Sequence, residues 1–352
     1  MTLLLLSLAE GRQRLGDAAS TADAPTLARR LRGAGAEQVC ITGIANDGGR
    51  ALCWLQAEHA RGWLASTTPA HGTWPAFAGH LANASARGFV AADAAVLAMM
   101  QTHHPGALPL LSWNEEPVVP VLAAGPMRRL DLYAIVDSAD RLQQVLATGL
   151  KTVQLRIKTP QQPSPEWFDT LRSEVRRSVQ ASDAAGAELF INDHWRIAFE
   201  AGARGAHLGQ EDLLALGVDG RKELQATGMA LGVSSHSLWE LCRARALAPR
   251  YIACGPVWPT LTKAMPWRAQ GLDNLSWWCR TAQVPVVAIG GILQADTVRE
   301  AARCGADGVC IVRGLGEQPA LVIPALQEAL EAGRRDAPVD APAWPHPSLS
   351  PA

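Results

Sequence analysis

Two acidic side chains follow two short apolar segments in the middle of the chain. Asn192 and Asp193 come directly after the apolar run 189–191, and Asp212 follows the run 206–208. A helical stretch separates the runs, as is needed between parallel neighbouring strands, whose carboxyl ends meet at one edge of a sheet. Paired carboxylates there suit a hard divalent cation, most simply Mg²⁺ carrying a phosphorylated substrate. The alternative, left open by this segment alone, is that both aspartates only cap the following helices.

A cationic pattern lies on the segment TVQLRIK. By the two-residue period of a strand, Gln154, Arg156 and Lys158 point to one side. Both sides of a barrel strand are buried, so the polar side would face the barrel interior. Unpaired cations there cost several kcal/mol, and an anionic ligand is therefore expected. Internal salt bridges to Asp193 or Glu211 are the alternative.

The elements that must position these side chains alternate regularly between residues 127 and 335. Helical stretches separate successive strand candidates, and a last helix is expected at about 320–333. The strand candidates are 130–136, 152–158, 188–192, 206–208, 229–234, 251–255, 284–289 and 308–312. Eight such units in roughly 200 residues predict an α/β fold of the (β/α)₈ TIM barrel type, with its active site at the C-terminal strand ends. An open doubly wound sheet is the alternative, but no GxGxxG turn follows the first strand.

Further polar groups follow the later strands of this predicted barrel. Ser234 ends the fifth strand, and a proline-rich loop after the sixth carries Thr260, Thr262 and Lys263. Hydroxyls and an ammonium group suit phosphate oxygens. Glycines after the seventh and eighth strands allow backbone amides to approach a phosphate closely. The rim therefore predicts two anion sites, one beside the acidic pair and one lined by glycine.

Six segments in this order are similar to the motif series of the thiamine phosphate synthase family. They are QLRIK at 154–158, IND at 191–193, HLGQED at 207–212, GVSSH at 232–236, GPVWPTLTKAMP at 255–266 and AIGGI at 288–292. That family joins hydroxymethylpyrimidine diphosphate to thiazole phosphate and releases diphosphate. The resemblance implies a transferase with these two small-molecule substrates and with Mg²⁺ as cofactor.

The resemblance also implies roles for individual residues. Gln154, with the adjoining Leu155 and Ile157, is expected to line the pyrimidine diphosphate site. The expected diphosphate contacts are Arg156, Lys158, Asn192, Ser234 and Lys263, of which the three cations stabilise the leaving group. The expected Mg²⁺ ligands are Asp193 and Asp212. The expected contacts of the thiazole phosphate are Thr260, Leu261, Thr262, Gly291, Val312 and Arg313.

This chain departs from the family at the tip of the eighth strand. The family usually has a Val/Ile-Ser pair where this chain has Val312-Arg313. The arginine either binds the thiazole phosphate or points to solvent and leaves the Gly314 amide in that role. His207 and His236 lie within motifs but are expected to be structural. A thiazole tautomerase and a non-catalytic regulatory barrel are the alternative functions.

Residues 1–105 resemble the C-terminal half of hydroxymethylpyrimidine phosphate kinases, which have the ribokinase-like fold. A helix at 26–33 and strands at 38–42 and 52–55 precede a His71-Gly72-Thr73 turn and two further helices. Trp74 and Pro75 replace the glycine-rich reactive part of that turn, so no kinase activity is expected. A proline-rich linker is predicted at 106–126, the barrel at 127–335 and a disordered tail at 336–352.

The composition is that of an ordinary globular protein. Hydrophobic residues make up 48% and the net charge is −1, so no basic field indicates nucleic acid or a membrane surface as partner. Seven cysteines without a CxxC pair indicate reduced thiols, and the first residues lack a basic leader. A cytoplasmic protein is expected, and a homo-oligomer stays open.

Overall fold

The computed structural model describes residues 3–16, 21–45, 48–118, 128–259 and 266–349. The chain divides into two compact units that do not follow a single cut. One unit consists of Met1–Leu122, Ser237–Ala248 and His346–Ala352, and the other of Ala123–His236 and Pro249–Pro345. The predicted boundary near residue 126 therefore separates most of the chain, but a helix from the middle of the sequence folds with the N-terminal part.

The second unit is a closed barrel of parallel strands, as the alternating pattern predicts. Within the described residues its order is β10-β11-β12-β13-β6-β7-β8-β9, and β9 pairs with β10 to close it. The strands are β6 (Asp131–Val136), β7 (Thr152–Leu155), β8 (Glu188–Asn192), β9 (Gly205–Leu208), β10 (Ala230–Ser235), β11 (Tyr251–Cys254), β12 (Val286–Ala288) and β13 (Gly308–Ile311). The TIM-barrel prediction is confirmed.

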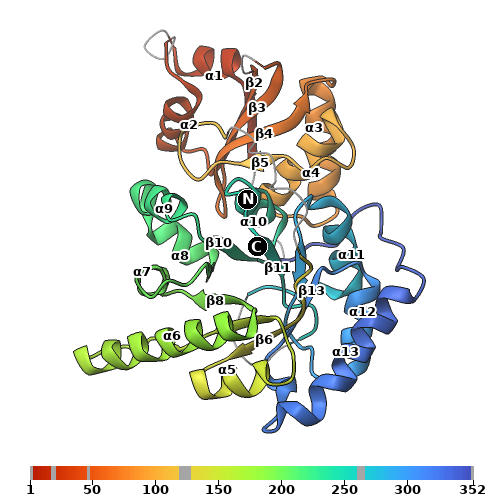
Figure 1. The fold of residues 1–352 in the computed structure, drawn as a ribbon. Helices are drawn as coiled ribbons and strands as arrows, with labels where there is room; N and C mark the ends of the chain where they lie inside the picture. Colours follow the sequence, from red (N-terminus) through yellow and green to blue (C-terminus); the bar gives the residue numbers. More distant parts are fainter. Residues whose placement is uncertain (1–2, 17–20, 46–47, 119–127, 260–265, 350–352) are drawn as a thin grey trace. The chain divides into compact units, whose positions relative to one another are not determined.

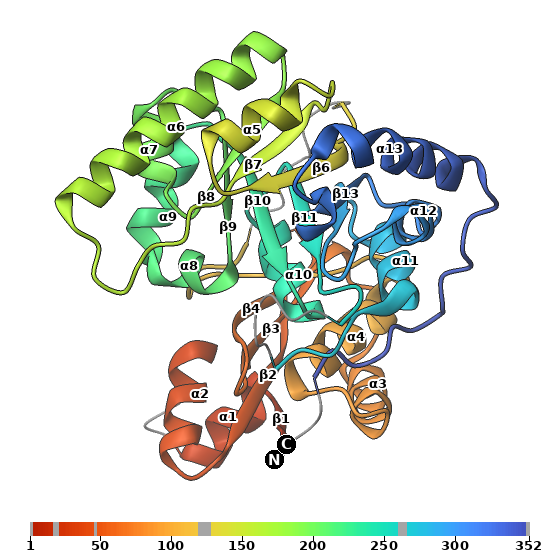
Figure 2. The ribbon, with the colours of Figure 1, turned by 90° about the horizontal axis from the view of Figure 1, so that it is seen from below.

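Helices surround the barrel strands (Figures 1 and 2). They are α5 (Ala139–Leu146), α6 (Pro165–Ala185), α7 (Trp195–Glu200), α8 (Gln210–Ala215), α9 (Gly217–Ala226), α11 (Gly271–Thr281), α12 (Ala295–Arg303) and α13 (Pro319–Arg335). Local sequence fixes their ends. For α6, the hydroxyl of Ser164 accepts from the Trp167 N–H, Pro165 starts the first turn, and Gly186 ends the helix in the left-handed conformation.

The barrel interior is filled by large side chains rather than left as a pore. Tyr133, Phe190 and Tyr251 are fully buried there and meet edge-on or tilted, with ring centroids 5.0 to 5.8 Å apart. Such aromatic pairs add to the free energy gained by burying apolar surface. The packed interior leaves the strand tips as the place where a substrate can bind.

The first unit contains a mixed sheet with helices on both faces (Figure 1). Its strands are β1 (Leu3–Ser7), β2 (Gln38–Ala45), β3 (Arg50–Gln56), β4 (Arg61–Pro69) and β5 (Leu110–Leu111), and its first helices are α1 (Leu8–Leu15), α2 (Ala24–Gly33), α3 (Trp74–Ala86) and α4 (Ala91–His103). β1 pairs in parallel with β2, and the other pairs are antiparallel. The sequence predicted only two of these strands, β2 and β3, and did not predict β1, β4 or β5.

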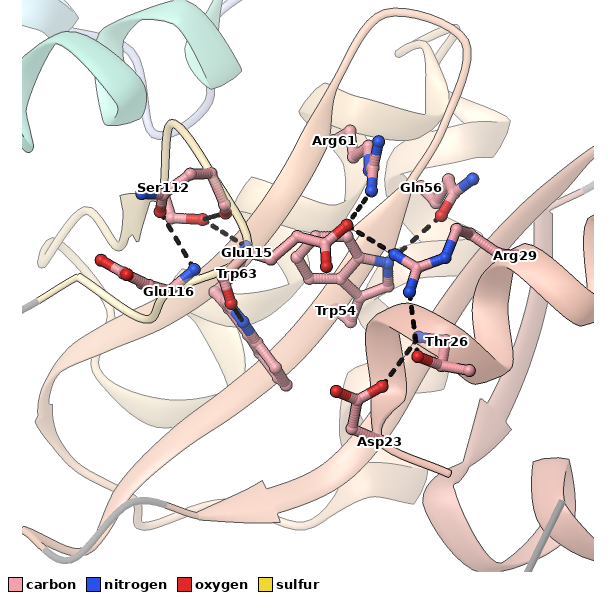
Figure 3. A network of polar contacts seen from close by, with 11 residues as sticks. Asp23, Thr26, Arg29, Trp54, Gln56, Arg61, Trp63, Ser112, Glu115 and Glu116 are labelled. Carbon is pink, nitrogen blue, oxygen red and sulfur yellow. Dashed lines mark hydrogen bonds and ion pairs between the residues drawn. The ribbon is translucent and has the colours of Figure 1, made fainter. Parts of the chain in front are cut away.

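The segment that was predicted as the start of a linker pairs with this sheet and forms hydrogen bonds to it (Figure 3). β5 pairs with β4, and the Ser112 hydroxyl accepts a hydrogen bond of 2.8 Å from the Trp63 N–H. The Trp63 indole donates to the Glu115 carbonyl at 2.7 Å, and the Glu115 carboxylate pairs with Arg29 and Arg61. The structure therefore differs from the linker prediction up to this point.

Helix α10 (Leu238–Arg245) lies between β10 and β11 in sequence but belongs to the first unit. It packs there against α4 and β5. The carboxylate of Asp93, on α4, is 1% exposed and accepts from the backbone N–H groups of Leu238 at 2.9 Å and Trp239 at 3.1 Å. The first turn of α10 thus has a buried acidic cap from another part of the chain.

The C-terminal segment also differs from its prediction as a disordered tail. Asp336 pairs with Arg299 at 2.7 Å, and Arg280 donates to the carbonyls of Ala341 and Pro342. These contacts hold proline-rich chain against α11 and α12, although its composition alone predicted no structure. Among the helices of the described residues, none has the length and apolarity needed to span a bilayer.

Candidate active site

The predicted acidic pair lies at the C-terminal ends of neighbouring strands. Asp193 directly follows β8, and Asp212 lies in the first turn of α8 after β9. Asp193 has φ 62°, a left-handed conformation that aspartate tolerates better than most residues. Its N–H donates to the carbonyl of His207 at 3.0 Å, and its carbonyl accepts from the Trp195 N–H at 2.9 Å. These backbone bonds fix the turn that presents the carboxylate at the rim.

The two carboxylates are close enough to affect each other's charge. Loss of water around the carboxyl raises the pKa of Asp193, and the negative charge of Asp212 raises it further. His194, Arg156 and a hydrogen bond from Asn192 act in the opposite direction without reversing the shift. At Asp193, burial and the second carboxylate together therefore outweigh the neighbouring positive groups and the hydrogen bond.

Asp212 also serves the helix that carries it. Its Oδ2 accepts from the Gly209 N–H at 3.1 Å, so the capping interpretation is correct for this residue. The other carboxylate oxygen is not needed for that bond. Within the described ranges, no group of three or more His, Cys, Asp or Glu side chains is arranged to hold a metal ion. Asp193 and Asp212 could contribute two ligands, which suits Mg²⁺ because Mg²⁺ usually retains several waters or phosphate oxygens.

The β7 tip follows the predicted pattern only in part. Gln154 is 2% exposed and points into the barrel, and Arg156 is half-buried and near enough to Asp193 and His207 to shift their pKa values. The strand ends at Leu155, however, and Lys158 is exposed. The prediction of a strand through residue 158 with an inward-facing lysine is wrong. The Arg156 N–H donates to the carbonyl of Val136, the last residue of β6. Because β6 ends there, the residues after Arg156 have no strand to pair with on that side.

The remaining residues predicted on this side of the site are at the same rim. Leu155 is buried, Ile157 is half-buried just beyond it, and Asn192, the last residue of β8, is 7% exposed. Ser234, on β10, is half-buried and accepts or donates a hydrogen bond of 2.9 Å with Nε2 of His207. Gln154, Asn192 and Ser234 lie on β7, β8 and β10, and β9, which carries His207, stands between the last two in the barrel.

His207 is held by hydrogen bonds rather than poised as a base. It is buried, and burial together with the Arg156 charge lowers the pKa of His207 to about 4. Its Nδ1 lies 2.8 Å from the Tyr251 hydroxyl, and the two rings stack. The sequence predicted a structural role for His207 but did not identify Tyr251 as its hydrogen-bond partner. The two residues come close only when the barrel closes. His236 stacks on Trp267 with ring centroids 5.3 Å apart.

The glycine-lined sector lies at the ends of β12 and β13. Gly291 has φ 73°, and a Cβ atom built there would come within 2.5 Å of the Trp258 Cβ. Only glycine fits there, because Trp258 packs directly against the backbone of Gly291. Val312 and Arg313 are exposed at the β13 tip, where Arg313 starts the short 3₁₀ turn Arg313–Leu315. The predicted residues Thr260, Leu261, Thr262 and Lys263 lie outside the described residues.

Comparisons with known proteins agree with the barrel and its motifs. Residues 132–315 match the family described as thiamine monophosphate synthase. A thiamine-phosphate synthase of Rhizobium etli is 43% identical over 193 residues, which cover 54% of this chain and 90% of that protein. One of Neisseria meningitidis is 41% identical over 201 residues, covering 56% and 93%. A solved thiamine phosphate pyrophosphorylase from Pyrococcus furiosus has 27% identity and a TM-score of 0.49, covering 58% of this chain and 96% of its own.

Proposed function

This chain belongs to the thiamine monophosphate synthase family, and from that premise we propose that its barrel joins hydroxymethylpyrimidine diphosphate to a thiazole phosphate and releases diphosphate. The observation that carries the proposal is the acidic pair Asp193 and Asp212 beside Arg156. A purely structural salt bridge would lower the pKa of Asp193, whereas that pKa is raised. The rim therefore favours a further positive ligand and, with it, an anionic substrate.

The residues around this pair suit a diphosphate group. Arg156 offers a planar set of donors, and Asn192 and Ser234 offer an amide and a hydroxyl at the tips of β8 and β10, on either side of β9. Lys158 is exposed just beyond β7, from where its long side chain can reach an oxygen at the rim. In the proposed site, Gln154 and the adjoining Leu155 and Ile157 line the pyrimidine end.

The acidic pair fits Mg²⁺ by its chemistry. Two carboxylates on adjacent strands, one of them with a raised pKa, are hard oxygen ligands that gain from a divalent cation. Asp193 and Asp212 would hold the ion, and when bound it supplies positive charge to the departing diphosphate. The finer assignment of Mg²⁺ over another divalent ion rests on the resemblance to the family.

In the proposed reaction, the bond between the pyrimidine methylene carbon and the diphosphate oxygen breaks, and its electron pair leaves with the diphosphate. The thiazole nitrogen supplies the electron pair of the new bond to that carbon. Arg156 and Lys158 stabilise the growing charge on the leaving group. This bond change does not require any side chain to remove a proton. The low pKa and full hydrogen bonding of His207 agree with a site that lacks a general base.

The thiazole phosphate is proposed to bind at the glycine-lined sector. Gly291 follows β12 with the backbone conformation that glycine favours, and Val312 is exposed at the tip of β13, the neighbouring strand, as an apolar surface for the ring. Phosphate groups commonly bind after strands seven and eight of such barrels. Thr260, Thr262 and Lys263 are proposed to complete this end from the loop after β11.

Diphosphate release tests the proposal directly. The full chain is mixed with both substrates and Mg²⁺, and then with each component omitted or with EDTA added. We expect release that needs the thiazole phosphate and stops with EDTA. Asp193→Asn should lower kcat/KM by about 100-fold or more, whereas Asp219→Asn, at an exposed site on α9, should leave it unchanged. Turnover of the thiazole alone would indicate a tautomerase, and no turnover of either substrate would indicate a binding protein.

A further inference from the structure

A continuous chain of buried hydrogen bonds crosses the barrel interior from one candidate substrate residue to another. Gln154 Nε2 donates to the Tyr133 hydroxyl at 2.8 Å, and that hydroxyl lies 2.8 Å from the hydroxyl of Tyr251. Tyr251 lies 2.8 Å from Nδ1 of His207, whose Nε2 lies 2.9 Å from the Ser234 hydroxyl. The members come from β7, β6, β11, β9 and β10, so the closed barrel is needed to assemble them.

The number of hydrogens on each group determines which atom donates and which accepts in each of these hydrogen bonds. The Gln154 amide nitrogen carries only hydrogens, so the Tyr133 oxygen accepts there and its own hydrogen points to Tyr251. If Nδ1 of His207 carried a hydrogen, the Tyr251 oxygen would accept twice and the Tyr251 hydrogen would meet no partner among the described side chains. The Tyr251 hydrogen therefore points to Nδ1, and the hydrogen of the imidazole is on Nε2 and is donated to Ser234.

The opposite direction leaves a buried hydrogen without an acceptor. If Tyr251 donated to Tyr133, the Tyr133 oxygen would accept twice and its own hydrogen would meet no partner among the described side chains. An unpaired donor in a site this dry costs about 1–3 kcal/mol. Burial also raises the pKa of both tyrosines far above the usual value, so both keep their hydrogens.

We propose that His207 and Tyr251 are positioning residues that turn the hydroxyl hydrogen of Ser234 toward the substrate. Because Ser234 accepts from His207, its own hydrogen is left to be donated into the rim, where a phosphate oxygen can accept it. In the opposite direction, Ser234 would donate to His207 and present only lone pairs to an anion. This inference rests on the proposed function, in which Ser234 contacts the diphosphate.

The backbone makes room for this arrangement. Gly232 lies two residues before Ser234, on the same inward side of β10. A Cβ atom built on Gly232 would come within 2.3 Å of the Tyr251 ring and 2.5 Å of its hydroxyl oxygen. Any larger residue would therefore push the phenol away from His207. The glycine of the GVSSH segment thus has a specific task, namely to admit the tyrosine that orients the histidine.

The tautomer of His207 can be measured in the unliganded protein. Long-range ¹H–¹⁵N spectra of histidine-labelled full-length chain distinguish protonated from unprotonated ring nitrogens, and the His207→Gln variant assigns the signal. We expect hydrogen on Nε2 and none on Nδ1 at neutral pH. Hydrogen on Nδ1 would overturn the proposal. This measurement needs no turnover, so it decides the direction of the chain even where the proposed function fails.

Kinetics of paired variants test whether His207 acts through Ser234. Ser234→Ala should raise the KM for pyrimidine diphosphate about ten- to hundredfold, as expected for a lost hydrogen bond to a charged group. His207→Leu should raise it about tenfold in the wild-type background and less than twofold in the Ser234→Ala background. His207→Gln, which keeps a donor near the Nε2 position, should restore the KM to within about threefold.

The neighbouring Ser235 provides the matched control. It is fully buried and bonded to Gln210 rather than to His207, so the effects of Ser235→Ala and His207→Leu should multiply independently. If His207→Leu fails to fold, Tyr251→Phe provides a second variant. It keeps the ring but removes the hydroxyl, and should produce part of the same rise in KM. Equal effects of His207→Leu with and without the Ser234 hydroxyl would overturn the positioning role. No diphosphate release from the wild type would instead overturn the proposed function.

Discussion

The buried cap of α10 predicts an unusual dependence of stability on pH. Burial raises the pKa of Asp93 to about 7, with a further contribution from Glu240, although hydrogen bonds from the Trp239 and Leu238 N–H groups oppose the shift. Cys242 also interacts electrostatically with Asp93. In the unfolded chain Asp93 ionises at its ordinary, much lower pKa. The folded state therefore binds one proton more between the two pKa values, and stability falls as pH rises toward 7.

The size of the effect follows from that interval. Each pKa unit is worth about 1.4 kcal/mol, so raising the pH from 5 to 8 should remove about 3 kcal/mol of stability through Asp93. Asp93→Asn keeps an oxygen for the same two N–H groups and has no charge to bury. It should exceed the wild type modestly near pH 5, where Asp93 of the unfolded chain is already ionised, and by about 3 kcal/mol more near pH 8. Asp93→Ala leaves both N–H groups unpaired and should lose about 2–5 kcal/mol near pH 5, and less near pH 8, where the wild type has itself lost stability through Asp93.

Urea unfolding at pH 5 and 8 measures these differences, and hydrogen exchange of the peptide containing α10 locates them. Asp23→Asn is a suitable control, because Asp23 caps α2 in an exposed position and its pKa is lowered rather than raised. Its effect should not change between pH 5 and 8. Parallel losses in the wild type and Asp93→Asn would show that Asp93 is already ionised at pH 5, and the reasoning from burial would be refuted.

Three other predictions concern the rim and the division of the chain. Arg313 is exposed, so Arg313→Ser should change turnover by less than about tenfold, or 1.4 kcal/mol, and a far larger rise in the KM for thiazole phosphate would show direct binding. Gly291→Ala places a methyl group against Trp258 at a positive φ, and should raise that same KM more than tenfold; an unchanged KM would exclude Gly291 from the site. Residues 128–352 expressed alone should aggregate or show weakened circular dichroism, because they lack the partners of α10; a stable, active fragment would contradict this.

The barrel could be predicted because its signals are local. Each strand is a short apolar run with a polar or glycine residue at its tip, and the parallel order then brings Asp193 and Asp212 together. These residues could be placed close together without knowledge of how side chains pack. The same reasoning placed Gln154 inside the barrel and Arg156 near the acidic pair.

The parts that could not be predicted depend on distant partners. Lys158 lies beyond the strand and is exposed because β7 stops where β6 stops, and the length of a strand is set by its neighbour. The contact between His207 and Tyr251 joins residues that lie 44 positions apart. Helix α10 has the length and apolar content of an ordinary barrel helix, and nothing in its own sequence reveals that Asp93 caps it. Local patterns identify elements, whereas partners across the fold decide where they end and what they contact.

The sharing of α10 has a consequence for how the protein denatures. Melting the first unit would remove the helix that connects β10 to β11, and melting the second would pull on both ends of that helix. Neither unit can lose its order without disturbing the other. Calorimetry should therefore record one joint heat-absorption peak, even though the described residues form two sheets with separate hydrophobic clusters.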